Sequence, residues 1–188
     1  MITPTASLKI LWGGWALLWF LGAAWSARTV ARESAASRLL YTVLMGIGSV
    51  MVFFGWDFGM FYDSMYPRTP MIAWLGVALT VIGLGFTVWA RVQIGRFWSG
   101  TVTLKEGHEL IRSGPYAITR HPIYTGLLFA LIGTAVTVDR VGVVPGLVLV
   151  TAGIVAKVRS EERLLLEHFG DAYRDYRAQV PALIPRPW

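Results

Sequence analysis

The sequence lacks cysteine altogether and is poor in charged residues. Its 188 residues include no Cys and only 15% Asp, Glu, Lys and Arg, whereas soluble domains have about 25% charged residues. Without cysteine the chain has no disulfide framework and no thiolate metal site. The three histidines stand far apart, at positions 108, 121 and 168. This spacing does not match a histidine metal site, so we predict no bound metal.

Several motifs of soluble enzymes are also missing. The sequence contains no G-x-S-x-G elbow and no P-loop. It has no strand–GxGxxG–helix unit either, which excludes a Rossmann-type dinucleotide-binding or soluble methyltransferase domain.

Apolar residues make up 55% of the chain and gather in long runs. A membrane-spanning helix needs about 20 mainly apolar residues. Five segments approach this length, namely residues 8–27, 39–62, 71–90, 122–138 and 141–156. We therefore predict an all-α integral membrane protein with about five transmembrane helices, forming a single domain over residues 1–188. Residues 1–70 hold two spans without motifs, and residues 71–188 hold the rest.

Basic residues gather on one side of these predicted spans. With the N-terminus outside, 14 of the 17 Lys and Arg residues fall on the inner side. Cytoplasmic loops show such an excess, so we predict an outside N-terminus and a cytoplasmic C-terminus. Topology then explains the net charge of +6, and we expect no nucleic-acid partner. The inner loop 91–121, in which residues 101–104 alternate like a short strand, and the tail 157–188 are long enough to build a site.

Two polar clusters lie on this inner side. The first is GPYAITRHPIYTG at residues 114–126. Proline is tolerated in the first turn of a helix, so Pro122 predicts a helix start with His121 at its N-cap. The dipole and the unpaired N–H groups of such a helix start favour an anion.

The second cluster follows the fifth span and contains Lys157, Glu161 and Glu162. A tight hairpin of the last two spans would bring both clusters together in a half-buried cytoplasmic pocket, the usual character of a small-molecule site. Alternatively, Arg120 and His121 only mark the membrane boundary, and the second cluster is the polar face of an interfacial helix.

The segment GHELIRSGPYAITRHPIYTG, followed by EERLLLEHFGDAYRDYRAQVPALIP, resembles the isoprenylcysteine carboxyl methyltransferase family. Its members are small integral membrane enzymes that use S-adenosylmethionine. The resemblance covers about residues 86–188. Within the family, the sequence is similar to the compact prokaryotic members.

The resemblance implies roles for particular residues. The implied cofactor-binding residues are His108, Glu109, Leu110, Ile111, Tyr116, His121, Pro122, Ile123, Tyr124 and Glu161. Arg120 or Lys157 would orient the acceptor, and Glu162 would act as the base if the acceptor is an amine. Lys157 stands where the eukaryotic members usually have an arginine, whose bidentate fork a lysine lacks.

The function that follows is methyl transfer from S-adenosylmethionine to a lipophilic acceptor that enters from the bilayer. The expected acceptor group is the carboxylate of an isoprenylcysteine-like or other lipid-like molecule. The expected location is the cytoplasmic face of a prokaryotic inner membrane. Membrane lipids are therefore expected partners. Three alternatives stay open: a phospholipid N-methyltransferase, an NADPH-dependent membrane reductase, and a non-enzymatic transport or scaffold protein.

Overall fold

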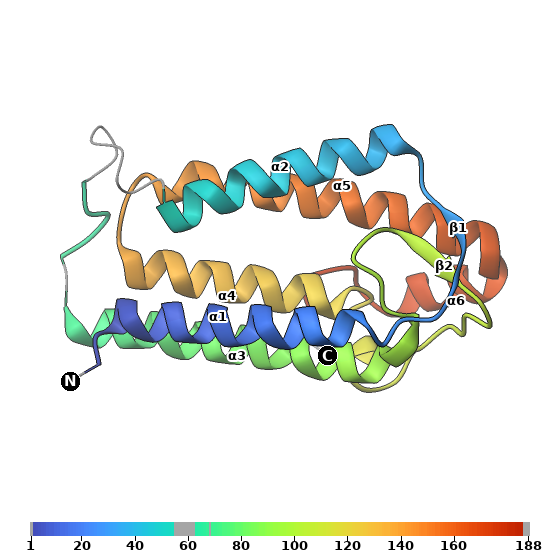
Figure 1. Cartoon of the computed structure of the whole chain (residues 1–188), viewed down its shortest axis with the longest axis horizontal. Coiled ribbons are helices and arrows are strands. Elements are labelled where there is room, and N and C mark those ends of the chain that lie inside the picture. Colours follow the sequence, from blue (N-terminus) through green and yellow to red (C-terminus); the bar gives the residue numbers. More distant parts are fainter. Residues whose placement is uncertain (1, 55–62, 68, 186–188) are drawn as a thin grey trace.

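The computed structural model describes residues 2–54, 63–67 and 69–185 (Figure 1). The elements are α1 Pro4–Ala23, β1 Thr29–Arg32, α2 Ala35–Phe54, α3 Pro70–Ile94, η3 Gly95–Phe97, β2 Thr103–Lys105, η4 Gly114–Ala117, α4 Pro122–Val138, α5 Val143–Phe169 and α6 Asp171–Gln179. All five predicted spans coincide with helices. The end of the second span, at residues 55–62, lies outside the described residues.

The ends of the helices follow local sequence signals. α1 and α3 each begin at a proline, and the preceding Thr3 and Thr69 accept backbone N–H groups at 3.2 and 3.3 Å. α4 begins at Pro122 with His121 at its N-cap, as predicted. α5 continues through the second polar cluster and ends at Gly170, whose φ of 54° suits a residue without a side chain.

The long helices have the length and composition of membrane spans. Four of them, α1, α2, α3 and α5, are long and apolar enough to cross a membrane. α4 has only 17 residues, about 25 Å of helix. Large apolar side chains cover the outside of the bundle, such as Phe20 at 79% and Ile82 at 67% exposure. Such a surface suits contact with lipid, so the chain is a multi-pass membrane protein by these criteria. The predicted orientation stays a prediction.

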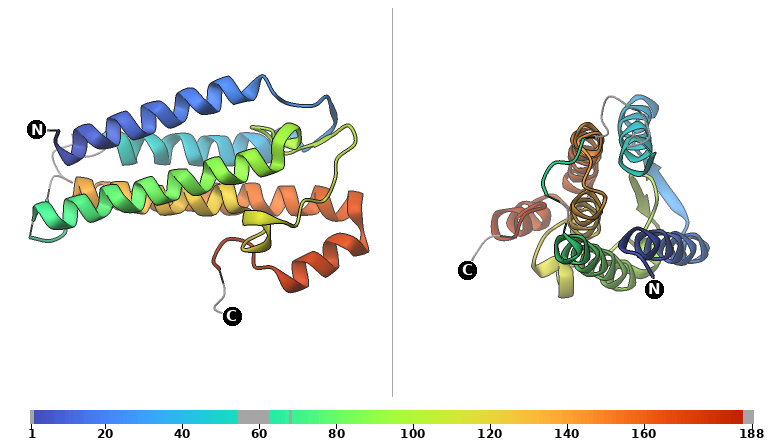
Figure 2. Two further views of the ribbon diagram at one scale, coloured as in Figure 1. Left: turned by 90° about the horizontal axis from the view of Figure 1, so that it is seen from below. Right: turned by 90° about the vertical axis from the view of Figure 1, so that its left-hand side faces the viewer.

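The helices pack in two pairs, α3 with α4 and α2 with α5, while α1 lies beside α3 and α4 (Figures 1 and 2). Glycines allow these close approaches. A Cβ atom on Gly76 would lie 2.6 Å from the carbonyl oxygen of Gly133, and one on Gly48 would lie 2.7 Å from that of Gly146. The predicted hairpin of α4 and α5 has the expected short connection at residues 139–142, but the two helices do not pack tightly along their length. They are consecutive, but each uses its glycines against another helix.

The close packing of α3 on α4 predicts that two neighbouring glycines differ in their tolerance of alanine. A Cβ atom on Gly83 would lie 2.6 Å from the carbonyl oxygen of Gly126, whereas nothing lies within 4 Å of one on Gly85. Gly83→Ala should cost about 1–3 kcal/mol of stability through overpacking. Gly85→Ala should be neutral or stabilise by up to about 1 kcal/mol, because alanine favours the helix. Thermal unfolding in detergent measures both, and equal effects would contradict this packing.

The fold also contains a small antiparallel sheet, so the prediction of an all-α protein is wrong in this respect. β2 overlaps the alternating segment 101–104 that predicts a strand. It pairs with β1 in a register of Thr29 with Lys105 and Arg32 with Thr103. The partner strand escaped prediction because its residues look like the basic flank of the first span. The sheet attaches the connection between α1 and α2 to the loop that precedes α4.

Candidate active site

A cavity of about 260 Å³ lies at the end of the bundle where α3 ends and α4 begins. Its walls come from helices α1 to α6 and the long loop between α3 and α4. Twelve of the thirteen residues predicted as site residues line it. They are His108, Glu109, Leu110, Ile111, Tyr116, Arg120, His121, Pro122, Ile123, Tyr124, Lys157 and Glu161. Although α4 and α5 do not pack tightly along their length, the two polar clusters do meet.

The C-terminal segment contacts the start of α4. The backbone N–H groups of Arg120 and His121 donate to the carbonyl oxygens of Pro181 and Ala182, at 2.8 and 3.1 Å. The hydroxyl of Thr125 donates to the carbonyl oxygen of Leu183 at 2.7 Å. The chain itself therefore occupies these two amide groups, and the expectation of an anion at the first turn of α4 stays a prediction.

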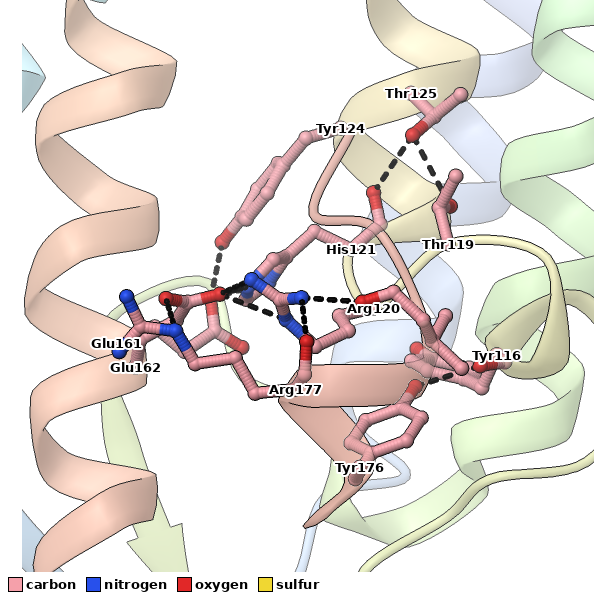
Figure 3. Close-up of polar contacts among 11 residues, drawn as sticks. Tyr116, Thr119, Arg120, His121, Tyr124, Thr125, Glu161, Glu162, Tyr176 and Arg177 are labelled. Carbon is pink, nitrogen blue, oxygen red and sulfur yellow. Dashed lines mark hydrogen bonds and ion pairs between the residues drawn. The ribbon is translucent and has the colours of Figure 1, made fainter. Parts of the chain in front are cut away.

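Glu162 is held by the first polar cluster (Figure 3) and does not line the cavity. Its Oε1 accepts hydrogen bonds from Nε and Nη2 of Arg120, at 2.9 and 2.6 Å. Nε2 of His121 lies 3.3 Å from the same oxygen, and Nε of Arg177 lies 3.7 Å from Oε2. The side chains of Arg120 and Glu162 are only 8% and 13% exposed. Glu162 does not line the cavity, so the geometry does not favour the predicted role of a base and points to a positioning role.

Glu161 is the carboxylate that reaches the cavity from α5. Its Oε2 accepts the hydroxyl of Tyr124 at 2.9 Å and lies 3.8 Å from Nδ1 of His121. Consecutive residues of a helix point about 100° apart. The side chains of Glu161 and Glu162 therefore point into different surroundings. Glu161 reaches the cavity, and Glu162 belongs to the buried ion pair.

Lys157 brings a positive charge to the same cavity one turn before Glu161. The residue is 8% exposed, and its Nζ donates to the carbonyl oxygen of Gly100 at 2.6 Å. Nζ also lies 5.1 and 5.6 Å from the ring centroids of Tyr41 and Tyr124. Within the described part of the chain, it forms no salt bridge with a carboxylate. A buried ammonium group without a carboxylate partner suits the binding of an anion.

His108 contributes a neutral ring to the cavity wall. The ring stacks on Phe97 with centroids 5.1 Å apart, and its Nδ1 accepts the backbone N–H of Lys105 at 3.3 Å. Burial lowers the pKa of His108, and the neighbouring His168 acts in the same direction, while Glu161 opposes them. Burial therefore favours the neutral imidazole, and with Nδ1 accepting a hydrogen bond its proton belongs on Nε2.

Sequence reasoning missed the tryptophans that form one side of the cavity. Trp15 and Trp19 of α1 stack with centroids 4.6 Å apart, and Trp19 meets Trp98 edge-on at 5.4 Å. Nε1 of Trp15 donates to the hydroxyl of Thr87 at 2.7 Å, which ties α1 to α3. Trp15 and Trp19 stand four residues apart, on one face of α1, and this spacing is a usable signal. The first span therefore contributes to the site although it carries no motif.

A second, larger cavity adjoins the first. It measures about 530 Å³ and shares Trp15, Met45 and Leu127 with the first cavity. Its lining comes from α1, α2, α4 and α5 and is mainly apolar, with Thr5, Lys9, Ser49 and Thr134 as the polar members. Its lining on α1 extends from Thr5 to Ala16, about 16 Å of helix. A polar cavity at the end of the bundle thus continues into an apolar one within it.

Residues 71–172 match the family model described as phospholipid methyltransferase. The protein-S-isoprenylcysteine O-methyltransferase of Mus musculus is 32% identical over 130 residues, which are 65% of this chain and 46% of that protein. Protein-S-isoprenylcysteine O-methyltransferase B of Arabidopsis thaliana is 28% identical over 113 residues, 58% of this chain and 57% of that protein.

The nickel-cobalt-cadmium resistance protein NccN of Alcaligenes xylosoxydans xylosoxydans is 31% identical over 116 residues, 60% of this chain and 53% of that protein. Within residues 2–54, 63–67 and 69–185, the structure contains no group of three or more His, Asp or Glu that could hold a metal ion. This chain spans about half the length of the three relatives. The family model covers more than half of the chain, in agreement with the resemblance of the motifs. The chain therefore belongs to the phospholipid methyltransferase family and is related to the isoprenylcysteine O-methyltransferases.

Proposed function

We propose that this protein transfers a methyl group from S-adenosylmethionine to the carboxylate of a lipophilic acceptor, at the cytoplasmic face of a prokaryotic inner membrane. The observation that carries the proposal is the pair of adjoining cavities. One holds a carboxylate and a buried ammonium group, and the other is apolar. This combination suits a polar methyl donor and an acceptor with an ionised head and a hydrocarbon tail.

The residues of the first cavity fit the donor chemically. The cavity of about 260 Å³ is close to the lower end of the range for small-molecule sites, about 300–1,000 Å³. The carboxylate of Glu161 would accept hydrogen bonds from the amino or ribose groups of the donor. The faces of Tyr116 and Tyr124 would attract its sulfonium by about 0.5–2 kcal/mol. When bound, the donor supplies an electrophilic methyl group whose transfer leaves its sulfur uncharged.

The chain's own contribution is to position the reactants and to exclude water. Orientation alone provides up to about 7–11 kcal/mol in favourable cases. The ammonium group of Lys157 would bind the acceptor carboxylate, which needs no general base. An amine acceptor is favoured less, because Lys157 would repel its protonated form and because Glu162, the expected base, is held by Arg120. These contacts support a carboxylate acceptor over phospholipid N-methylation.

The apolar cavity would hold the tail of the acceptor. It meets the polar cavity at Trp15, Met45 and Leu127, and helices α1 and α2 form one side of it. Its extent along α1, about 16 Å, suits a hydrocarbon chain that runs from the polar cavity towards the opposite end of the bundle. A lipid-like acceptor could therefore enter from the membrane with its head in the polar cavity.

The reductase and the non-enzymatic alternatives have less support. A reductase would need several cations to bind the 2′-phosphate of NADPH. The two polar clusters supply Arg120 and Lys157, and Arg120 already binds Glu162. A transport or scaffold subunit does not need the polar cavity, and the family is one of methyltransferases. Both alternatives predict that S-adenosylmethionine does not bind.

Methyl transfer is tested with purified protein and methyl-labelled S-adenosylmethionine. The acceptor panel consists of a prenylcysteine, a long-chain fatty acid and a phosphatidylethanolamine. We expect label on a carboxylate acceptor, released as methanol by mild alkali because a methyl ester is hydrolysed. Alkali-stable label on phosphatidylethanolamine alone would support N-methylation instead. Absence of transfer to every acceptor would count against the proposal.

A further inference from the structure

Glu33 lies outside the region that matches the family, in the connection between β1 and α2. Its carboxylate accepts hydrogen bonds from three separate parts of the chain. The hydroxyl of Tyr41 on α2 and the backbone N–H of Val102 donate to Oε1, the latter at 3.3 Å. The hydroxyl of Ser160 on α5 donates to Oε2 at 3.0 Å. One carboxylate thus joins α2, α5 and the loop before β2.

These same parts of the chain surround Lys157. Tyr41 is 3% exposed, and its ring lies 5.1 Å from Nζ of Lys157. The carbonyl oxygen that accepts from Nζ belongs to Gly100, two residues before Val102 in the loop that Glu33 holds. Glu33 therefore fixes both the aromatic face and the carbonyl group that contact the ammonium group. The carboxylate of Glu33 itself accepts the hydroxyl of Tyr41 and forms no direct ion pair with Lys157.

We propose that Glu33 and Tyr41 are positioning residues that hold the ammonium group of Lys157 in the cavity wall, where it binds the carboxylate of the acceptor. The use of Lys157 for the acceptor rests on the proposed function. The arrangement leaves the positive charge available to a ligand, because its neighbours are a carbonyl group and aromatic rings. It makes the connection between the first two helices part of acceptor recognition.

The test compares Glu33→Gln and Tyr41→Phe with Glu106→Gln. Glu106 is exposed in the turn after β2 and undergoes the same chemical change as Glu33. We expect the first two variants to raise the KM for the acceptor about tenfold, the effect of one lost hydrogen bond to a charged group. Their affinity for S-adenosylmethionine should stay close to that of the wild type, whereas their thermal stability should fall somewhat, because Glu33 joins α2, α5 and the loop before β2. Glu106→Gln should behave as the wild type throughout.

A double-mutant cycle separates positioning from a general structural role. If Glu33 acts through Lys157, Glu33→Gln should add little to the loss caused by Lys157→Met. Fully additive losses would overturn the proposal. So would equal losses in the affinity for the donor and in the KM for the acceptor.

A second measurement does not depend on methyl transfer. Competitive labelling with a small amine-reactive reagent, read by mass spectrometry, compares Lys157 with Lys9 in the same sample. Loss of the Glu33 carboxylate loosens the surroundings of the ammonium group and disfavours its charge, so labelling of Lys157 should be several-fold faster in Glu33→Gln. Unchanged labelling in both Glu33→Gln and Tyr41→Phe would overturn the positioning proposal. A wild-type protein without methyl transfer would instead count against the proposed function.

Discussion

Alanine at position 120 should destabilise the protein by about 3–5 kcal/mol, the usual cost of removing one partner from a buried ion pair. Arg120 donates two hydrogen bonds to Glu162, and both side chains are largely buried. It also donates to the carbonyl oxygens of Arg177 and Val180, so its loss would release the segment after α6 as well. Thermal unfolding in detergent measures the effect.

Arg174→Ala is the matched control for Arg120→Ala. Arg174 pairs with Asp171, but these side chains are 65% and 87% exposed, so the pair contributes at most about 1 kcal/mol. Replacing Arg120 and Glu162 together by methionine should recover much of the loss, because no unpaired charge is then buried. If Arg120→Ala and Arg174→Ala had equal effects, the buried ion pair would not stabilise the site as described.

Glu161→Ala should weaken the binding of S-adenosylmethionine by about 10- to 100-fold. A hydrogen bond to a charged group contributes about 1.5–3 kcal/mol, and each 1.4 kcal/mol is a factor of about ten in affinity. The variant also leaves the hydroxyl of Tyr124 without the acceptor that it has at 2.9 Å. Titration calorimetry measures the dissociation constant.

Glu167→Ala is the control on the same helix, because Glu167 is exposed and does not line the cavity. It should bind the donor as the wild type does. His121, which is 4% exposed and lines the cavity, gives an independent check through His121→Ala. Undiminished donor binding in both Glu161→Ala and His121→Ala would refute the assignment of this site.

Local sequence signals predicted the helices, and the family resemblance supplied the residues that the structure places around one cavity. Pro122 and Gly170 mark a helix start and a helix end because of their own backbone preferences. The meeting of the two polar clusters could also be predicted, because the ends of successive spans return to the same face of the membrane. Glu161 and Glu162 were both candidates. Only the packing showed that the first reaches the cavity and the second pairs with Arg120.

The remaining features depend on contacts between distant parts of the chain. Gly48 meets Gly146, and Gly76 meets Gly133, but a glycine in an apolar run does not reveal which helix it approaches. The strand at residues 29–32 exists because it pairs with residues 103–105. Glu33 follows that strand, so its link to Lys157 emerges only once the sheet has formed. Likewise, the carbonyl groups of residues 181–183 carry no side-chain signal of their contact with α4.

The most direct test of the central claim is a calorimetric titration of the detergent-purified protein with S-adenosylmethionine and, separately, with NADPH. We predict that one S-adenosylmethionine binds per chain, that Glu161→Ala weakens this binding while Glu167→Ala does not, and that NADPH does not bind. A protein that is folded by thermal unfolding yet binds no S-adenosylmethionine, or that binds NADPH in the same cavity, would contradict the account.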